Sequence, residues 1–128
     1  MNYFNTEDTI CAITTGGGMS AIAIIRISGK NAIKITNSVF SKDISDSKTH
    51  TLHFGNFTYN KEVIDEILVS IFRGKKSFTG EESVEISCHG SVYIQNKILQ
   101  ILIENDCRLA TAGAVSYTHL TLPTILRV

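Results

Sequence analysis

A chain of 128 residues, with 43% hydrophobic and 19% charged residues, has the length and composition of one compact domain. Twelve basic residues balance twelve acidic ones, so no net charge recruits the chain to nucleic acid or to an anionic membrane. No apolar run approaches the roughly 18 residues of a membrane-spanning helix, and the polar N-terminus is unlike a secretory signal, so we expect a cytoplasmic protein with no membrane contact.

The first part of the chain predicts two strands and a helix. Residues 9–15 and 21–28 are strand-like, and the glycines at 16–18 between them are typical of a hairpin turn. Apolar residues at helical spacing predict a helix over residues 31–40, with Ser28 as its candidate N-cap. The glycines do not belong to a Gly-x-x-x-x-Gly-Lys-Ser/Thr motif, so nucleotide binding by this chain is not expected.

The middle of the chain predicts extended structure. Apolar residues in 52–59 indicate one extended segment, residues 60–61 a turn, and residues 63–72 a long apolar strand. The only dense basic cluster follows, at Arg73, Lys75 and Lys76. A solvated loop is favoured there over contact with phosphate or RNA.

Residues 77–90 predict a polar loop that runs into a strand. Period-two alternation puts Val84, Ile86 and Cys88 on one face of this strand. The other face then carries a row of polar side chains, which are Ser83, Glu85, Ser87 and His89. Such a row can bind a small polar ligand.

The end of the patterned chain predicts a helix over residues 92–105 and a strand over residues 107–110. Strand pairs mixed with two helices predict a two-layer α+β domain with a mixed sheet. The three cysteines, Cys11, Cys88 and Cys107, are odd in number and form no Cys-x-x-Cys, so we expect reduced thiols and neither a disulfide framework nor a metal site.

Arg26 is the main candidate for a binding residue because it lies in phase with Ile22 and Ile24 on an apolar strand face. An unpaired arginine there is costly, and Glu85 is its natural acidic partner. Two interpretations stay open. The residues form a structural cross-strand ion pair, or they flank a pocket in which the carboxylate accepts the paired N–H groups of an amino-pyrimidine such as a pterin. For His89, capping the next helix or orienting a loop is favoured over action as a base.

Residues 115–124 follow no element that the preceding chain prepares. Their sequence, Val-Ser-Tyr-Thr-His-Leu-Thr-Leu-Pro-Thr, is the translation of GTC-TCT-TAT-ACA-CAT-CTG-ACG-CTG-CCG-ACG, which is similar to a sequencing-library adapter. We therefore expect a domain over residues 1–113, ending near Gly113, and a non-native tail over residues 114–128. The alternative is a strand and turn ended by Pro123.

Several segments resemble the MnmE (TrmE) family of tRNA modification GTPases. Residues 8–13 and 21–29 are similar to the opening of that family, and residues 77–85 with His89 and Gly90 are similar to its second signature. Asp65 also fits, and residues 109–113 are similar to the family's Leu-Ala-x-Pro-Gly motif. The resemblance covers about residues 6–113, with Ser91 standing where the family has a second glycine.

The resemblance implies an N-terminal domain with the fold of folate-binding aminomethyltransferases. Such domains form a homodimer and bind a tetrahydrofolate derivative, in the 5-formyl or methylene form. Arg26 and Glu85 fall on two of the family's folate-contacting positions, and Ser77, Thr79, Gly80 and His89 belong to a possible site loop. The third folate contact, a lysine from a later motif, is absent from this sequence.

For the full-length family, the resemblance implies work with the flavoprotein MnmG (GidA) on the wobble uridine of tRNA, to which an aminomethyl-type group is added. GTP, Mg²⁺ and K⁺ would serve a GTPase domain that this chain lacks, so we expect no GTPase activity from it. The alternatives are a stand-alone folate-dependent aminomethyltransferase and a purely structural dimerisation module.

Overall fold

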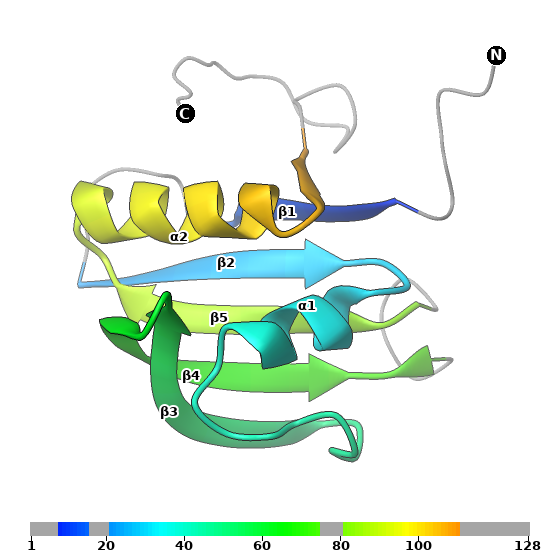
Figure 1. The fold of residues 1–128 in the computed structure, drawn as a ribbon. Coiled ribbons are helices and arrows are strands. Elements are labelled where there is room, and N and C mark those ends of the chain that lie inside the picture. The colour runs from blue at the N-terminus through cyan, green and yellow to red at the C-terminus, as the bar shows by residue number, and fades with distance from the viewer. Residues whose placement is uncertain (1–7, 16–20, 75–80, 111–128) are drawn as a thin grey trace, which may run out of the picture.

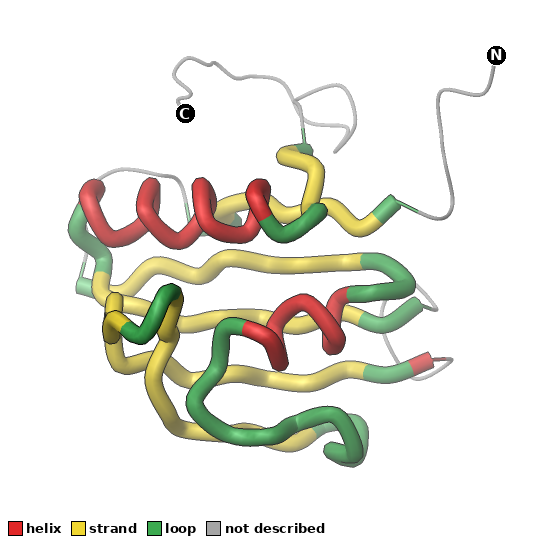
Figure 2. The backbone as a smooth tube through the Cα atoms, viewed as in Figure 1, coloured by secondary structure: helices red, strands yellow, loops and turns green. Residues whose placement is uncertain are grey.

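The structure, a computed structural model, describes residues 8–15, 21–74 and 81–110 (Figures 1 and 2). In chain order the elements are β1 (Thr9–Ile13), β2 (Ile22–Ser28), α1 (Ala32–Ser38), β3 (Thr51–Tyr59), β4 (Glu62–Phe72), β5 (Ser83–His89), α2 (Val92–Glu104) and β6 (Cys107–Leu109). The predicted α+β class is confirmed. The turn predicted at residues 16–18 and the tail predicted at residues 114–128 lie outside the described residues.

The described strands form one mixed sheet in the order β3-β4-β5-β2-β1-β6. Strands β3, β4, β5, β2 and β1 pair with their neighbours antiparallel, whereas β6 pairs parallel with β1. Strands β2 and β5 are therefore neighbours in the middle of the sheet, although the chain between them contains a helix and a hairpin.

Both helices lie on the same face of this sheet, the near side in Figure 1. Alternate residues of the central strands point toward them and are fully buried, which are Ala23, Ile25 and Ile27 of β2, Ile67, Val69 and Ile71 of β4, and Val84, Ile86 and Cys88 of β5. Ile98 and Leu102 of α2 complete the core from the helical side. The strand residues between these positions point to the opposite face, and the helices do not cover that face.

The predicted N-cap at Ser28 is wrong. Ser28 is still part of β2, where it pairs with Ile10 and Ser83, so its backbone is extended. Helix α1 begins later, with Asn31 at the cap position, and the hydroxyl of Thr9 accepts the Asn31 N–H at 3.1 Å. A side chain from β1 thus replaces the local cap that the sequence suggested.

Gly29 makes the sharp connection from β2 to α1 possible. Its φ is +138°, a backbone conformation that side chains disfavour. A Cβ at this position would lie 2.6 Å from the Asp8 carbonyl oxygen and 2.7 Å from the Thr9 Cα, both of which are backbone atoms.

We expect Gly29→Ala to lower the free energy of unfolding by more than about 2 kcal/mol, because strain and a backbone clash add together. Gly74→Ala is the matched control, since Gly74 also has positive φ (+56°) but has nothing within 4 Å of the added Cβ. The control should lose about 1 kcal/mol, from backbone strain alone. Urea unfolding measures both, and equal losses would contradict the close approach of β1.

Candidate functional site

Arg26 and Glu85 form an ion pair across the middle of the sheet. They are direct register partners on β2 and β5. The Arg26 Nη2 and Nε atoms both donate to Glu85 Oε2, at 2.5 and 3.2 Å. The two side chains are 33% and 27% exposed, so the pair is accessible from solvent. The predicted partnership of these two residues is therefore present, and the cross-strand ion pair is its form in this structure.

The pair retains hydrogen-bonding capacity. A carboxylate offers about four lone-pair positions on its two oxygens, and Arg26 occupies only Oε2. Among the described residues, no hydrogen bond to Glu85 Oε1 is formed. The carboxylate can thus accept N–H groups of a ligand without giving up Arg26.

The surroundings of the pair are apolar and open. Arg26 and Glu85 lie on the sheet face that the helices leave uncovered, hereafter the open face. In register with them across the sheet are Ser70 and Leu52, and the next row of the same face contains Ile24, Ser87, Leu68 and Phe54. Leu52 and Phe54 are 65% and 55% exposed. A charged pair beside exposed apolar side chains suits a ligand that has both polar edges and flat apolar surfaces.

His89 lies at the end of β5, four residues from Glu85, and the structure does not bring it into contact with the Arg26–Glu85 pair. Asp65 of β4 accepts two hydrogen bonds from it, one from the backbone N–H at 2.8 Å and one from ring Nδ1 at 2.6 Å. The His89 side chain is 68% exposed and that of Asp65 only 8%.

The expectation that His89 caps the next helix is wrong. Ser91 is the N-cap of α2, and its hydroxyl accepts the Ile94 N–H at 3.1 Å. His89 instead joins the end of β5 to β4 through Asp65. The remaining predicted site residues, Ser77, Thr79 and Gly80, lie outside the described residues.

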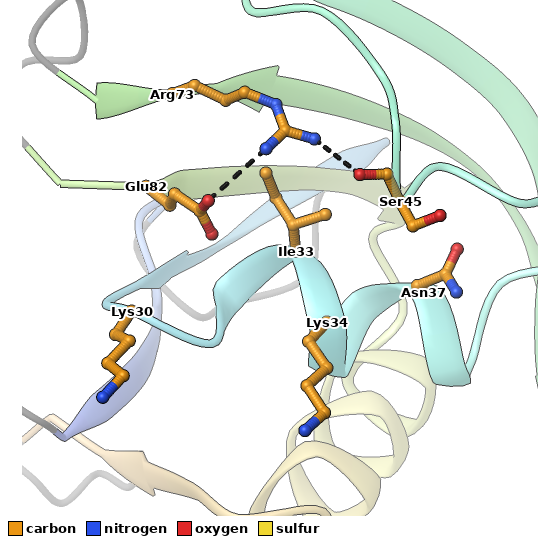
Figure 3. Close-up of a pocket in the computed structure, with 7 residues that line it drawn as sticks. All are labelled: Lys30, Ile33, Lys34, Asn37, Ser45, Arg73 and Glu82. Atoms are coloured by element: carbon orange, nitrogen blue, oxygen red, sulfur yellow. Dashed lines mark hydrogen bonds and ion pairs between the residues drawn. The ribbon is translucent and has the colours of Figure 1, made fainter.

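A hollow of about 280 Å³ lies beside α1 and the adjoining ends of β4 and β5, lined by Lys30, Ile33, Lys34, Asn37, Ser45, Arg73 and Glu82 (Figure 3). Arg73 follows the end of β4 and is tied to other segments, because it donates to the carbonyl oxygens of Ser47 and Ser45 at 2.6 and 2.8 Å and pairs with Glu82 at 3.5 Å. Lys75 and Lys76, for which a solvated loop was expected, lie outside the described residues. In Figure 3 the ammonium groups of Lys30 and Lys34 point away from Arg73, so the three cations do not converge on one ligand position.

The three cysteines are free and buried. A hydrogen bond with Cys107, and burial, raise the pKa of Cys11 far above its ordinary value. Burial, together with the nearby negative charge of Asp65, raises the pKa of Cys88 to about 11. The residues that the structure describes contain no cluster of His, Cys, Asp and Glu suited to a metal ion, and no helix among them could cross a membrane.

Comparison with known proteins gives a consistent result. The family model of the GTP-binding protein TrmE N-terminus matches residues 9–119. The match runs past Gly113, and the domain boundary predicted there stays a prediction.

Individual relatives agree with the family match. The tRNA modification GTPase MnmE of Flavobacterium johnsoniae is 52% identical over 111 residues, which cover 84% of this chain and 24% of the relative. MnmE of Flavobacterium psychrophilum is 54% identical and that of Bacteroides thetaiotaomicron 51%, with the same coverage of both chains. The chain thus spans about a quarter of the length of these relatives.

The raised pKa of Cys88 predicts a loss of stability at high pH. The folded state holds the thiol neutral up to about pH 11, whereas the unfolded chain ionises near its ordinary value of 9.0. The stabilisation that comes from the neutral thiol is therefore fully present below pH 9 and is lost as the pH rises from 9 toward 11. The Cys88→Ala variant has no thiol to ionise. The difference in free energy of unfolding between wild type and this variant should therefore shrink by about 1 kcal/mol between pH 8 and pH 10.5. Urea unfolding at the two pH values measures the difference, and a constant disadvantage would show that the thiol is not held neutral.

Proposed function

Because the chain belongs to the family of TrmE N-terminal domains, we propose that it is the folate-binding and dimerising module of a tRNA modification GTPase. Its ligand is a tetrahydrofolate derivative that carries a one-carbon unit, in the 5-formyl or methylene form. The module has no GTPase activity of its own. For the whole protein, we propose GTP hydrolysis with Mg²⁺ and K⁺, partnership with the flavoprotein MnmG (GidA) and tRNA as the substrate.

The observation that carries the folate proposal is the position of the Arg26–Glu85 pair on the open face. The pterin of a folate presents an amino group next to a ring N–H, and Oε1 of Glu85, whose lone pairs Arg26 does not use, can accept from such donors. Glu85 is held in place by Arg26, is partly exposed, and accepts no hydrogen bond at Oε1 from the described residues. Charge-assisted hydrogen bonds of this kind contribute roughly 1.5–3 kcal/mol each.

The open face also supports the dimerisation proposal. Leu52, Phe54 and Leu68 form an apolar patch on β3 and β4, and all three are exposed. Exposed apolar side chains that gather on one surface are typical of protein contacts. A second copy of the chain placed on this face would bury the patch next to the proposed folate position.

One observation favours the rival interpretation of a purely structural module. The two side chains are in direct contact with each other, with an Nη2–Oε2 distance of 2.5 Å. A partly exposed ion pair contributes only about 0–1 kcal/mol to stability, so stability alone does not separate the two interpretations. If the pair binds folate, loss of either residue weakens folate binding, and if the pair is structural, it does not.

Titration of 5-formyltetrahydrofolate into the chain tests the folate proposal. Wild type should bind and should show a higher melting temperature with ligand, whereas Arg26→Ala and Glu85→Gln should each weaken binding at least about tenfold. Ser70→Ala, a neutral change in register with Glu85, is the control and should bind as wild type does. If wild type gains nothing from folate while both variants melt at lower temperature, the pair is structural only.

Sedimentation equilibrium tests the proposed dimer. Wild type should be dimeric, and Phe54→Asp should be monomeric, because burying a carboxylate in an apolar contact is strongly unfavourable. Tyr93→Asp is the matched control, since Tyr93 is 70% exposed but lies on α2, away from the open face. A dimer that survives Phe54→Asp and dissociates with Tyr93→Asp would move the interface to the helical side.

A further inference from the structure

We propose that two copies of the chain join by antiparallel pairing of β3 with β3, which makes one continuous sheet across the dimer. This inference rests on the proposed dimerisation and names the element, the register and the bonds through which the copies meet. The proposed dimer brings Leu52 and Phe54 against a second copy, and the backbone of the same two residues determines how the copies meet.

Strand β3 is at one edge of the sheet, so only one of its sides is paired with another described strand (Figure 1). In an antiparallel strand, the backbone groups of successive residues point alternately to the two sides. Asn56 marks the outer side, because its N–H donates to Ser41 Oγ at 2.8 Å and its carbonyl accepts the Ser41 N–H at 2.9 Å. Phe54 and Leu52, two and four residues earlier, therefore also direct their N–H and C=O groups outward.

The outer backbone groups of Leu52 and Phe54 have no hydrogen-bond partner among the described residues. Further along the strand the edge is covered, since the Thr58 N–H donates to the Val39 carbonyl at 2.7 Å. The uncovered part, residues 51–55, contains none of the lysines, acidic residues or prolines with which natural edge strands prevent pairing. Leu52 and Phe54 are instead 65% and 55% exposed. This part of the edge is therefore suited to accept another strand.

Only one register lets this part of β3 pair with itself. A two-fold axis at His53 places Leu52 opposite Phe54 of the second copy and uses the outer groups of both residues. A shift toward the end of the strand would require the outer groups of Asn56, which are already bonded within the chain. A shift toward its start would require His50, whose φ of +62° is not that of a strand.

The side chains fit the same register. Leu52 and Phe54 point to the open face, so each leucine packs beside a phenylalanine of the other copy. Each of these facing pairs also exchanges both of its backbone hydrogen bonds. The apolar patch is thus complementary to itself, as a two-fold contact requires, and a second copy fits it in both backbone and side chains.

Amide hydrogen exchange of wild type tests the pairing without a substitution. A short contact belongs to the small interfaces below about 1,200 Å², where association is weak, so roughly 100 µM protein is compared with roughly 1 µM. The amides of Leu52 and Phe54 should exchange at least about tenfold more slowly at the higher concentration, because pairing protects them. The Thr58 amide, which is bonded within the chain, is the internal control and should not change.

Exchange of charge at His53 tests the register. His53→Glu and His53→Lys each place like charges directly opposite one another at the axis, which should weaken self-association about two- to fivefold. A mixture of the two variants should contain more heterodimer than random pairing gives, as native mass spectrometry measures. Val63→Glu and Val63→Lys are the matched controls, since Val63 is 58% exposed but lies on β4, and their mixture should pair at random. Melting temperatures show whether all four variants are folded.

The outcomes separate this inference from the dimerisation on which it rests. If Phe54→Asp dissociates a wild-type dimer, but the Leu52 and Phe54 amides exchange equally at both concentrations, the strand pairing is overturned and the dimer stands. Random pairing in the mixture of His53 variants overturns the register in the same way. If wild type is a monomer at roughly 100 µM, the proposed dimer fails and the strand pairing fails with it, which leaves the edge to water or to a strand of another protein.

Discussion

The two helices cover only one face of the six-stranded sheet, and the rest of the molecule depends on this asymmetry. Successive residues of a strand point to opposite faces, so every strand residue is assigned either to the core or to the open face. The core receives alternate apolar residues of three strands, which are almost completely buried: Ile25 and Ile27 of β2, Ile67, Val69 and Ile71 of β4, and Val84 and Ile86 of β5. The open face receives the ion pair, Ser70 and Ser87 next to it, and the exposed apolar residues of β3. A shift of one residue in the register of β5 would exchange these two sets and leave Glu85 in the core.

Polar groups on this domain differ in how completely the protein itself uses them. Asp65, whose side chain is 8% exposed, holds the end of β5, and Arg73, whose side chain is 31% exposed, holds the carbonyls of residues 45 and 47. Arg26 and Glu85 are about as open to water as Arg73, but Glu85 Oε1 accepts no hydrogen bond from the described residues. Their pairing adds little stability, and Oε1 is the group suited to exchange water for a ligand.

Local patterns in the sequence were sufficient for the elements but not for the contacts between them. Alternation along residues 83–89 predicted both the strand and its two faces, and the structure confirms them from Val84 to His89, whereas Ser83 of the predicted polar row is buried. The partnership of Arg26 with Glu85 followed from the cost of an unpaired charge, without knowledge that β2 and β5 are neighbours. The hydrogen bonds from His89 to Asp65 could not be predicted, because they depend on where the β4–β5 ladder ends. Ser28 was a wrong cap for a similar reason, since pairing on both sides of β2 extends the strand through that residue.

Strand β6 is the edge strand of the sheet next to β1, and it can pair with β1 only after nearly the whole described chain has been made. Its three residues pair in parallel with β1, and Thr9 of the first strand lies opposite Cys107 of the last. Contacts between residues so distant in sequence form slowly, because a long loop must close before they stabilise the fold. During synthesis, the edge of β1 that pairs with β6 therefore stays unpaired until the other strands have been made. An unpaired strand edge is a site of aggregation. The shortness of β1, five residues, limits this exposure.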